Sequence, residues 1–157
     1  MKIDAKVQSI SKLKDYFFLV PDYQREYVWK PDDEVEQFLI DIENEYSPDA
    51  KEQRNYFLGS IIIANNDRCF DVVDGQQRLT TIMLSLCVFR DLLKKETLNS
   101  AQKNYLQIIE NLLYNFDIES GETRVRLELQ YEESHDYLTA LIQELSLIHI
   151  SEPTRRS

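Results

Sequence analysis

The segment Asp74-Gly75-Gln76-Gln77-Arg78 has the residue types and spacing best suited to binding a phosphate. It lies where an apolar, β-branched run changes to a helical pattern, so we expect a strand that turns directly into a helix. Gly75 permits a tight turn, and the first N–H groups of the helix have no internal acceptor and can bind an anion. Arg78 supplies a planar, bidentate donor, and the two glutamine amides can donate and accept. Asp74 can hold a magnesium ion or a water molecule.

A structural explanation competes with this one. Asp74 followed by Gln77 three residues later is also a capping-box pattern, which would stabilise the helix by about 1 kcal/mol and nothing more. Arg78 is unfavourable in a first helical turn unless an anion or a carboxylate balances it. Spacing alone leaves both explanations open.

The loop expected after Val20 is a second candidate. It contains Tyr23, Gln24, Arg25, Tyr27 and Trp29 between a strand and a helix. Aromatic rings can stack on a nucleotide base, and an arginine can reach a phosphate. The alternative is that the aromatic rings only anchor the loop to the core, and the sequence does not decide between the two.

Hydrophobic periodicity predicts the elements that position these segments. Strands are expected at 17–20, 56–64, 69–73 and 124–131, and helices at 8–15, 31–46, 76–95, 100–116 and 134–145. The second and third strands form a hairpin around Asn65–Asp67, and the helix at 76–95 should be largely buried. The order predicts an α+β domain with a small sheet covered by helices. The domain is expected at 1–145, and residues 146–157 are expected to be an irregular and non-native tail.

Charge and cysteine usage exclude several classes of function. The formal net charge of −10 and the pI near 4.7 oppose nucleic-acid binding by the whole surface, so any DNA contact should be local, through residues such as Arg25, Lys30 and Arg78. Seven carboxylates and no Lys or Arg occur from Asp32 to Glu45, which is typical of a solvated helix face.

Two cysteines and two histidines give little support for metal or nucleophilic chemistry. Cys69 and Cys87 lack a metal-binding spacing and are expected to be inert thiols. His135 and His149 lie late in the chain, far from any plausible partner. No apolar run approaches the ~20 residues of a membrane span, and no signal peptide is evident, so we expect a cytoplasmic protein without a membrane partner.

Three segments together resemble a known family. VPDYQREYVW near the start, YFLGSIII and VVDGQQRLTTI are similar to the DGQQR-motif family, domain-of-unknown-function family 262, which forms the N-terminal half of GmrSD-type modification-dependent restriction proteins. The resemblance covers about residues 8–145. It implies a fold similar to the ParB and sulfiredoxin folds and a role in bacterial defence against phage or foreign DNA.

The resemblance also implies roles for individual residues. Asp74, Gly75, Gln76, Gln77 and Arg78 would bind a nucleoside triphosphate with Mg²⁺, with Asp74 and Arg78 as catalytic residues of its hydrolysis and Asp74 as the metal ligand. Tyr23, Gln24 and Arg25 would line the same site, and together with Trp29 they would sense modified DNA. The family's nuclease domain has no counterpart in these 157 residues, so we expect no nuclease activity of this chain alone and a nuclease domain as partner. The preferred triphosphate and the oligomeric state are left open.

Two alternatives remain. One is a ParB-like module that contacts duplex phosphates through Arg25, Lys30 and Arg78 without catalysis. The other is an inactive structural fragment of a truncated domain.

Overall fold

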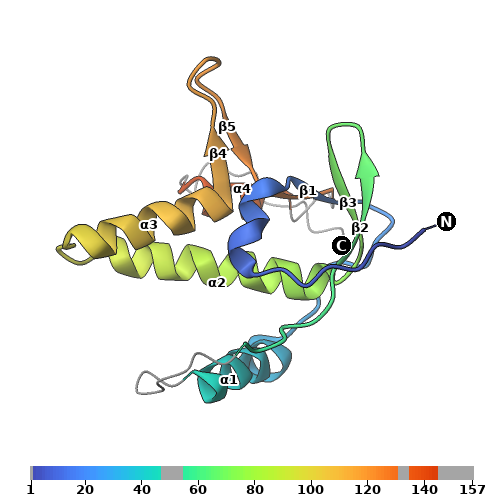
Figure 1. Ribbon diagram of the computed structural model, residues 1–157, viewed down its shortest axis with the longest axis horizontal. Coiled ribbons are helices and arrows are strands. Elements are labelled where there is room, and N and C mark those ends of the chain that lie inside the picture. Colours follow the sequence, from blue (N-terminus) through green and yellow to red (C-terminus); the bar gives the residue numbers. More distant parts are fainter. Residues whose placement is uncertain (1, 47–54, 131–134, 145–157) are drawn as a thin grey trace, which may run out of the picture.

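A four-stranded mixed sheet and the long helix packed against it form the centre of the computed structural model (Figure 1). The structure describes residues 2–46, 55–130 and 135–144. The strand order is β2 (Ile62–Asn66), β3 (Cys69–Asp74), β1 (Phe18–Val20) and β6 (Leu127–Leu129). β1 runs parallel to both β3 and β6, and β2 pairs antiparallel with β3. The predicted α+β class with a small sheet is confirmed.

The other elements surround this sheet. They are the short helices η1 (Ile10–Asp15) and η2 (Pro31–Val35), the helices α1 (Glu36–Glu45), α2 (Gln76–Lys94), α3 (Ser100–Leu113) and α4 (His135–Ile142), and the hairpin of β4 (Tyr114–Phe116) and β5 (Thr123–Val125). In Figure 1, α3 lies alongside α2, and α1 lies apart from the other helices. No helix in the described ranges is long and apolar enough to cross a membrane.

The core lies between α2 and the sheet. Leu79, Met83 and Cys87 of α2 are buried in one cluster with Phe18 and Val72 of the strands. These α2 residues follow one helical face, which is why the helix lies flat on the sheet. The N-terminal end of α2 is therefore fixed firmly at the edge where β3 ends.

The helix at 76–95 is less buried than its sequence predicts. Val88, Phe89 and Leu92 each expose more than half of their surface, because they lie on the face of α2 opposite to the buried Cys87 and Arg90. The helix predicted at 31–46 begins as a π-helical turn, and none of its described residues is buried. Its apolar Leu39 and Ile40 remain about 40% exposed, since α1 does not reach the core.

Two boundaries near the C-terminal half differ from the prediction. Residues 114–116, predicted as the end of a helix, are strand β4, because Tyr114 pairs with Val125 and Phe116 with Thr123. The strand predicted at 124–131 is divided at Arg126, whose N–H donates to Leu113 O and whose carbonyl accepts from Phe18 N. The alternating residues Val125, Leu127 and Leu129 are all buried, as their spacing predicts.

The hairpin of β2 and β3 is shorter than predicted at its start. β2 begins only at Ile62, and Asn65 and Asn66 continue the strand, so the turn falls at Asp67 and Arg68. A capping box with Asn99 and Gln102 stabilises the start of α3, where the Asn99 side chain accepts from Gln102 N at 2.9 Å.

Neither cysteine forms a disulfide. Cys87 is buried, and burial raises the pKa of its thiol to about 11, which keeps it protonated and unreactive at neutral pH. Cys69 is half-buried, and burial raises its pKa as well. The described residues contain no group of three or more His, Cys, Asp and Glu side chains that could hold a metal ion. His149 and the tail at 146–157 lie outside the described residues.

Candidate functional site

The predicted turn from strand to helix is present, and two features make Gly75 necessary there. β3 ends at Asp74 and α2 begins at Gln76, so Gly75 alone joins them, with a φ of +90°. A Cβ at this position would lie 2.8 Å from Ser60 O and 3.1 Å from the Cα of Ile61. A larger residue would therefore be strained and would clash with the backbone that leads into β2.

The predicted capping box at the start of α2 is wrong. Gly75 occupies the N-cap position, and no side chain accepts a hydrogen bond from the first turn. Asp74 Oδ1 instead accepts from Gly75 N at 2.9 Å, and the side chain of Gln77 points to the loop. The first N–H groups of α2 thus keep the capacity to bind an anion.

Gln77 connects the two segments that the sequence singles out. Its Nε2 donates to Glu26 O at 2.7 Å, and its Oε1 accepts from Val28 N at 2.8 Å and from Trp29 N at 3.3 Å. A side-chain amide that hydrogen-bonds to three backbone groups can replace the backbone hydrogen bonds that a neighbouring strand would supply. Gln77 therefore positions the loop in this structure.

Two further contacts hold the loop against the sheet and α2. Gln24 Nε2 donates to Val73 O at 3.2 Å, next to the turn. The hydroxyl of Tyr27 lies 2.9 Å from Thr81 Oγ1, which itself donates to Gln77 O. The loop is thus fixed at several points rather than at its ends alone.

The aromatic residues of the loop divide into buried and exposed ones. Trp29 is half-buried, and its ring packs against Phe38 of α1 at 6.0 Å between centroids. Tyr27 is also half-buried, so these two rings anchor the loop. Tyr23 is 74% exposed and Arg25 is exposed, which leaves the face of Tyr23 accessible for stacking.

Arg78 has an unusual neighbour that sequence reasoning missed. Its guanidinium lies on Gly59, where an added Cβ would be 2.4 Å from the Cζ of Arg78. The φ of Gly59 is +119°, and the Nε of Arg78 is buried without a hydrogen-bond partner among the described residues. A glycine inside an apolar strand pattern is the sequence signal for such a close approach.

The donor set suits magnesium only together with a phosphate. Asp74 is exposed and is the one predicted metal ligand, and no cluster of metal-binding side chains is found in the described part of the chain. Mg²⁺ commonly takes one or two carboxylates and completes its shell with substrate phosphates and water. Asp74 fits that role and does not make a metal site by itself.

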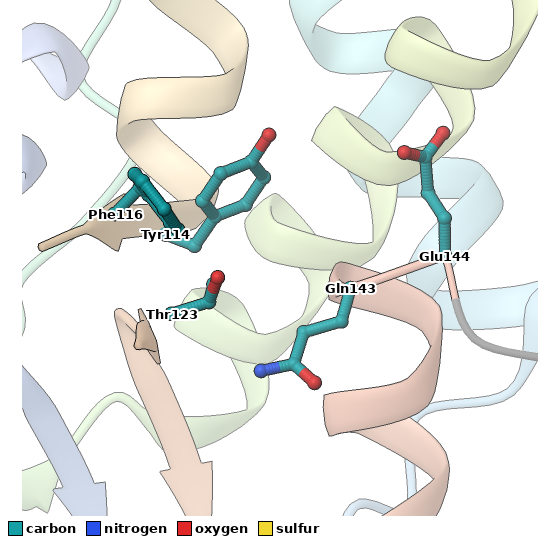
Figure 2. A pocket seen from close by; sticks show the side chains of 5 residues that line it. All are labelled: Tyr114, Phe116, Thr123, Gln143 and Glu144. Carbon is teal, nitrogen blue, oxygen red and sulfur yellow. The ribbon is translucent and has the colours of Figure 1, made fainter. Parts of the chain in front are cut away.

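Two hollows lie elsewhere on the molecule. One, of about 530 Å³, is lined by Tyr114, Phe116, Thr123, Gln143 and Glu144, which come from β4, β5 and the chain after α4 (Figure 2). The other, of about 450 Å³, lies along η2 and α1, between Leu39, Ile40 and acidic side chains. Neither contains a residue of the turn at 74–78. The candidate site is therefore a surface where a turn and a loop meet.

The fold and this surface define an α+β domain with a small mixed sheet. Strand β3 leads through the turn at 74–78 into α2, and the turn is held to a loop that carries tyrosine and arginine side chains. The chain matches the family described as "GmrSD restriction endonuclease, N-terminal domain" over residues 7–156, and it belongs to this family. Comparison with curated proteins gave no match. The resemblance seen in the sequence is thus confirmed.

Proposed function

We propose that the turn at 74–78 and the loop at 21–30 bind a nucleoside triphosphate together with Mg²⁺. The observation that supports this most is the state of Arg78. Among the residues that the structure describes, its buried Nε has no hydrogen-bond partner, and no side chain caps the adjacent start of α2. A buried arginine N–H that makes no hydrogen bond carries a desolvation cost. A phosphate at this place would accept from Arg78 and from the first N–H groups of α2.

The remaining residues have complementary roles in this proposal. The exposed ring of Tyr23 stacks on the base, while Gln24, Arg25 and Gln76 contact the sugar or phosphates. Asp74 would hold the magnesium ion, which would supply charge neutralisation when bound. In weak hydrolysis, Asp74 orients the metal or the attacking water, and Arg78 and Arg25 stabilise the charge on the transferred phosphoryl group.

We further propose that this binding regulates a modification-dependent restriction or phage-defence protein. Family membership supports a restriction module, and the chain alone would act through a separate or C-terminal nuclease domain. The loop residues Tyr23, Gln24, Arg25 and Trp29 would sense modified DNA. Gln77 supports a link between the two events, because it touches the loop and belongs to the nucleotide turn.

A thermal-shift titration tests the nucleotide site. The chain is titrated with each ribonucleoside triphosphate, with and without Mg²⁺, beside the variants Arg78→Ala and Lys103→Ala. Lys103 is an exposed residue of α3, so its variant makes the same change of charge away from the site. A ligand at about 100 times its Kd stabilises the folded state by about 2.7 kcal/mol, which raises the Tm measurably.

We expect a magnesium-dependent shift that Arg78→Ala removes and Lys103→Ala retains. An unchanged shift in Arg78→Ala would refute the assignment of Arg78. No shift with any nucleotide would favour a DNA-binding module without catalysis. That module's affinity for duplex DNA should fall steeply with salt, because counterions are released when phosphates are contacted.

A further inference from the structure

Two arginine side chains, Arg124 and Arg126, stack on Phe17 at a place away from the turn at 74–78, and the backbone of Arg68 lies beside them. The guanidinium carbon of Arg124 lies 3.8 Å from the centre of the Phe17 ring, and that of Arg126 lies 4.6 Å from it. A terminal nitrogen of Arg124 also donates to Arg68 O at 2.6 Å. The two guanidinium carbons are therefore no more than about 8 Å apart, a separation of about one Debye length at physiological salt.

The sheet topology explains why these residues come together. Phe17 precedes β1, Arg68 precedes β3, and Arg126 precedes β6. These three strands are parallel, so the residues before them lie at one end of the sheet. Asp74 ends β3 at the opposite end. Six residues of strand span about 20 Å, so this cluster is distinct from the turn at 74–78.

The two stacked arginines are held in place before any ligand binds. Arg126 is only 6% exposed, and its Nε donates to Asn111 O at 3.0 Å. Within the described residues, its terminal nitrogens have no hydrogen-bond acceptor. Arg124 is exposed but is fixed by the ring below it and by the carbonyl of Arg68. Such fixed cations lose little conformational freedom on binding an anion.

The positive charge of this cluster is not balanced by a direct ion pair. In the part of the chain that the structure describes, no carboxylate lies within 4.0 Å of the guanidinium groups of Arg68, Arg124 or Arg126. Burial lowers the pKa of Arg126, the more distant Asp15 raises it, and the charge of Arg124 lowers it further. The proximity of two like charges is thus unfavourable in a chain whose net charge is −10.

We infer that Arg124 and Arg126, stacked on Phe17, form a binding site for a phosphate group. Guanidinium groups pair with phosphate oxygens through parallel, charge-assisted hydrogen bonds, and a tetrahedral phosphate can accept from two such groups at once. The exposed Arg68 at the adjacent turn extends the site toward a neighbouring phosphate. The phosphate belongs to a polyphosphate or to a nucleic-acid backbone.

Arginine side-chain NMR can test this site directly. The Nε–Hε signals of the wild-type chain are followed during separate titrations with tripolyphosphate, with a short duplex DNA and with polyglutamate. The same titrations use Arg124→Gln, which removes both the positive charge and the two parallel N–H donors of the guanidinium. They also use Arg124→Lys, which keeps only the positive charge. Lys103→Gln on α3 is the control for the change of net charge.

We expect tripolyphosphate or DNA to shift the signals of Arg124 and Arg126, and the stronger of the two identifies the source of the phosphate. Arg124→Gln should weaken that binding about tenfold, Arg124→Lys should restore little of it, and Lys103→Gln should leave it unchanged. Equal losses in Arg124→Gln and Lys103→Gln would overturn the site, as would shifts with polyglutamate alone or with none of the three. The nucleotide-induced thermal shift should be unchanged in Arg124→Gln, so the two sites are tested independently.

Discussion

At the scale of single residues, the candidate site depends on two glycines with close neighbours. Gly75 allows the backbone of Ser60 and Ile61 to approach, and Gly59 leaves room for the guanidinium of Arg78. Both have positive φ angles, so both conformation and space exclude a side chain. The guanidinium of Arg78 therefore lies against a residue that comes before both strands of the β2–β3 hairpin.

Gly59→Ala should displace Arg78 and destabilise the fold. The added methyl group would lie 2.4 Å from the guanidinium, and the φ of +119° is strained for alanine, so we expect a loss of about 1–3 kcal/mol in the free energy of unfolding. Gly121→Ala is the matched control, because its φ is +70° but no atom lies within 4 Å of its Cβ. Urea denaturation measures the free energy of unfolding of both variants. Equal losses in the two would mean that the contact between residue 59 and Arg78 contributes nothing to stability.

At the scale of elements, the loop behaves as an extension of α2. The side chains of Gln77 and Thr81 are one helical turn apart, and they hold Glu26, Tyr27 and Val28. Residues four apart lie on the same face of a helix, so one face of the first turns carries the whole attachment. A displacement of the start of α2 would therefore move the loop as well.

Gln77→Ala should release the loop without unfolding the domain. The amide of Val28 donates to Gln77 Oε1 and would be left to solvent in the variant. We expect faster hydrogen exchange at Val28 and Trp29, with a stability loss of about 1–2 kcal/mol. Gln76→Ala is the control, since no loop residue bonds to the side chain of Gln76 within the described ranges. Unchanged exchange at Val28 would show that other contacts hold the loop.

At the scale of the whole molecule, one core joins sheet and helices, and two buried groups depend on its integrity. Arg90 is fully buried and donates to the carbonyls of Leu141 and Ile142, which ties α2 to the end of α4. Cys87 lies one turn before it in the core cluster. A neutral thiol in this place is compatible with burial, while a thiolate is not.

The pKa of Cys87 predicts a loss of stability in alkali. Burial raises this pKa to about 11 in the folded state, from about 9 in the unfolded chain, so the folded state retains its proton longer. The contribution of Cys87 to the free energy of unfolding is fully present below pH 9. It falls by about 1.4 kcal/mol per pH unit between pH 9 and pH 11. Denaturation measured from pH 8 to 11 should show a smaller decrease in the free energy of unfolding for Cys87→Ala than for the wild type. Parallel curves of stability against pH would contradict the prediction.

The sequence predicts elements better where their partners are near in the chain. The α2 helix, the hairpin before it and the cap at Asn99 follow from local spacing, and all are present. The end of α3 does not follow from local spacing, because residues 114–116 become a strand only by pairing with Thr123–Val125. The exposure of α1 also depends on its distance from the core, which periodicity does not encode.

The candidate site was predictable in its residue types but not in its contacts. The strand-to-helix turn follows from the sequence pattern, whereas the contact of Trp29 with Phe38 decides between two roles that the sequence left open. The capping box failed, because Gln77 finds three loop groups that are about fifty residues away in the chain. The alternation at 124–131 placed Arg124 and Arg126 on one face, and only the parallel strands brought Phe17 to them.

The position of β1 has a consequence for the order of folding during synthesis. Phe18 is synthesised before both of its partners, because it pairs with Phe70 on one side and with Leu127 on the other. Contacts so distant in sequence require closure of long loops, which slows their formation. β1 must therefore wait for β6 before the four-stranded sheet is complete, and until then its apolar residues are exposed to chaperones and proteases.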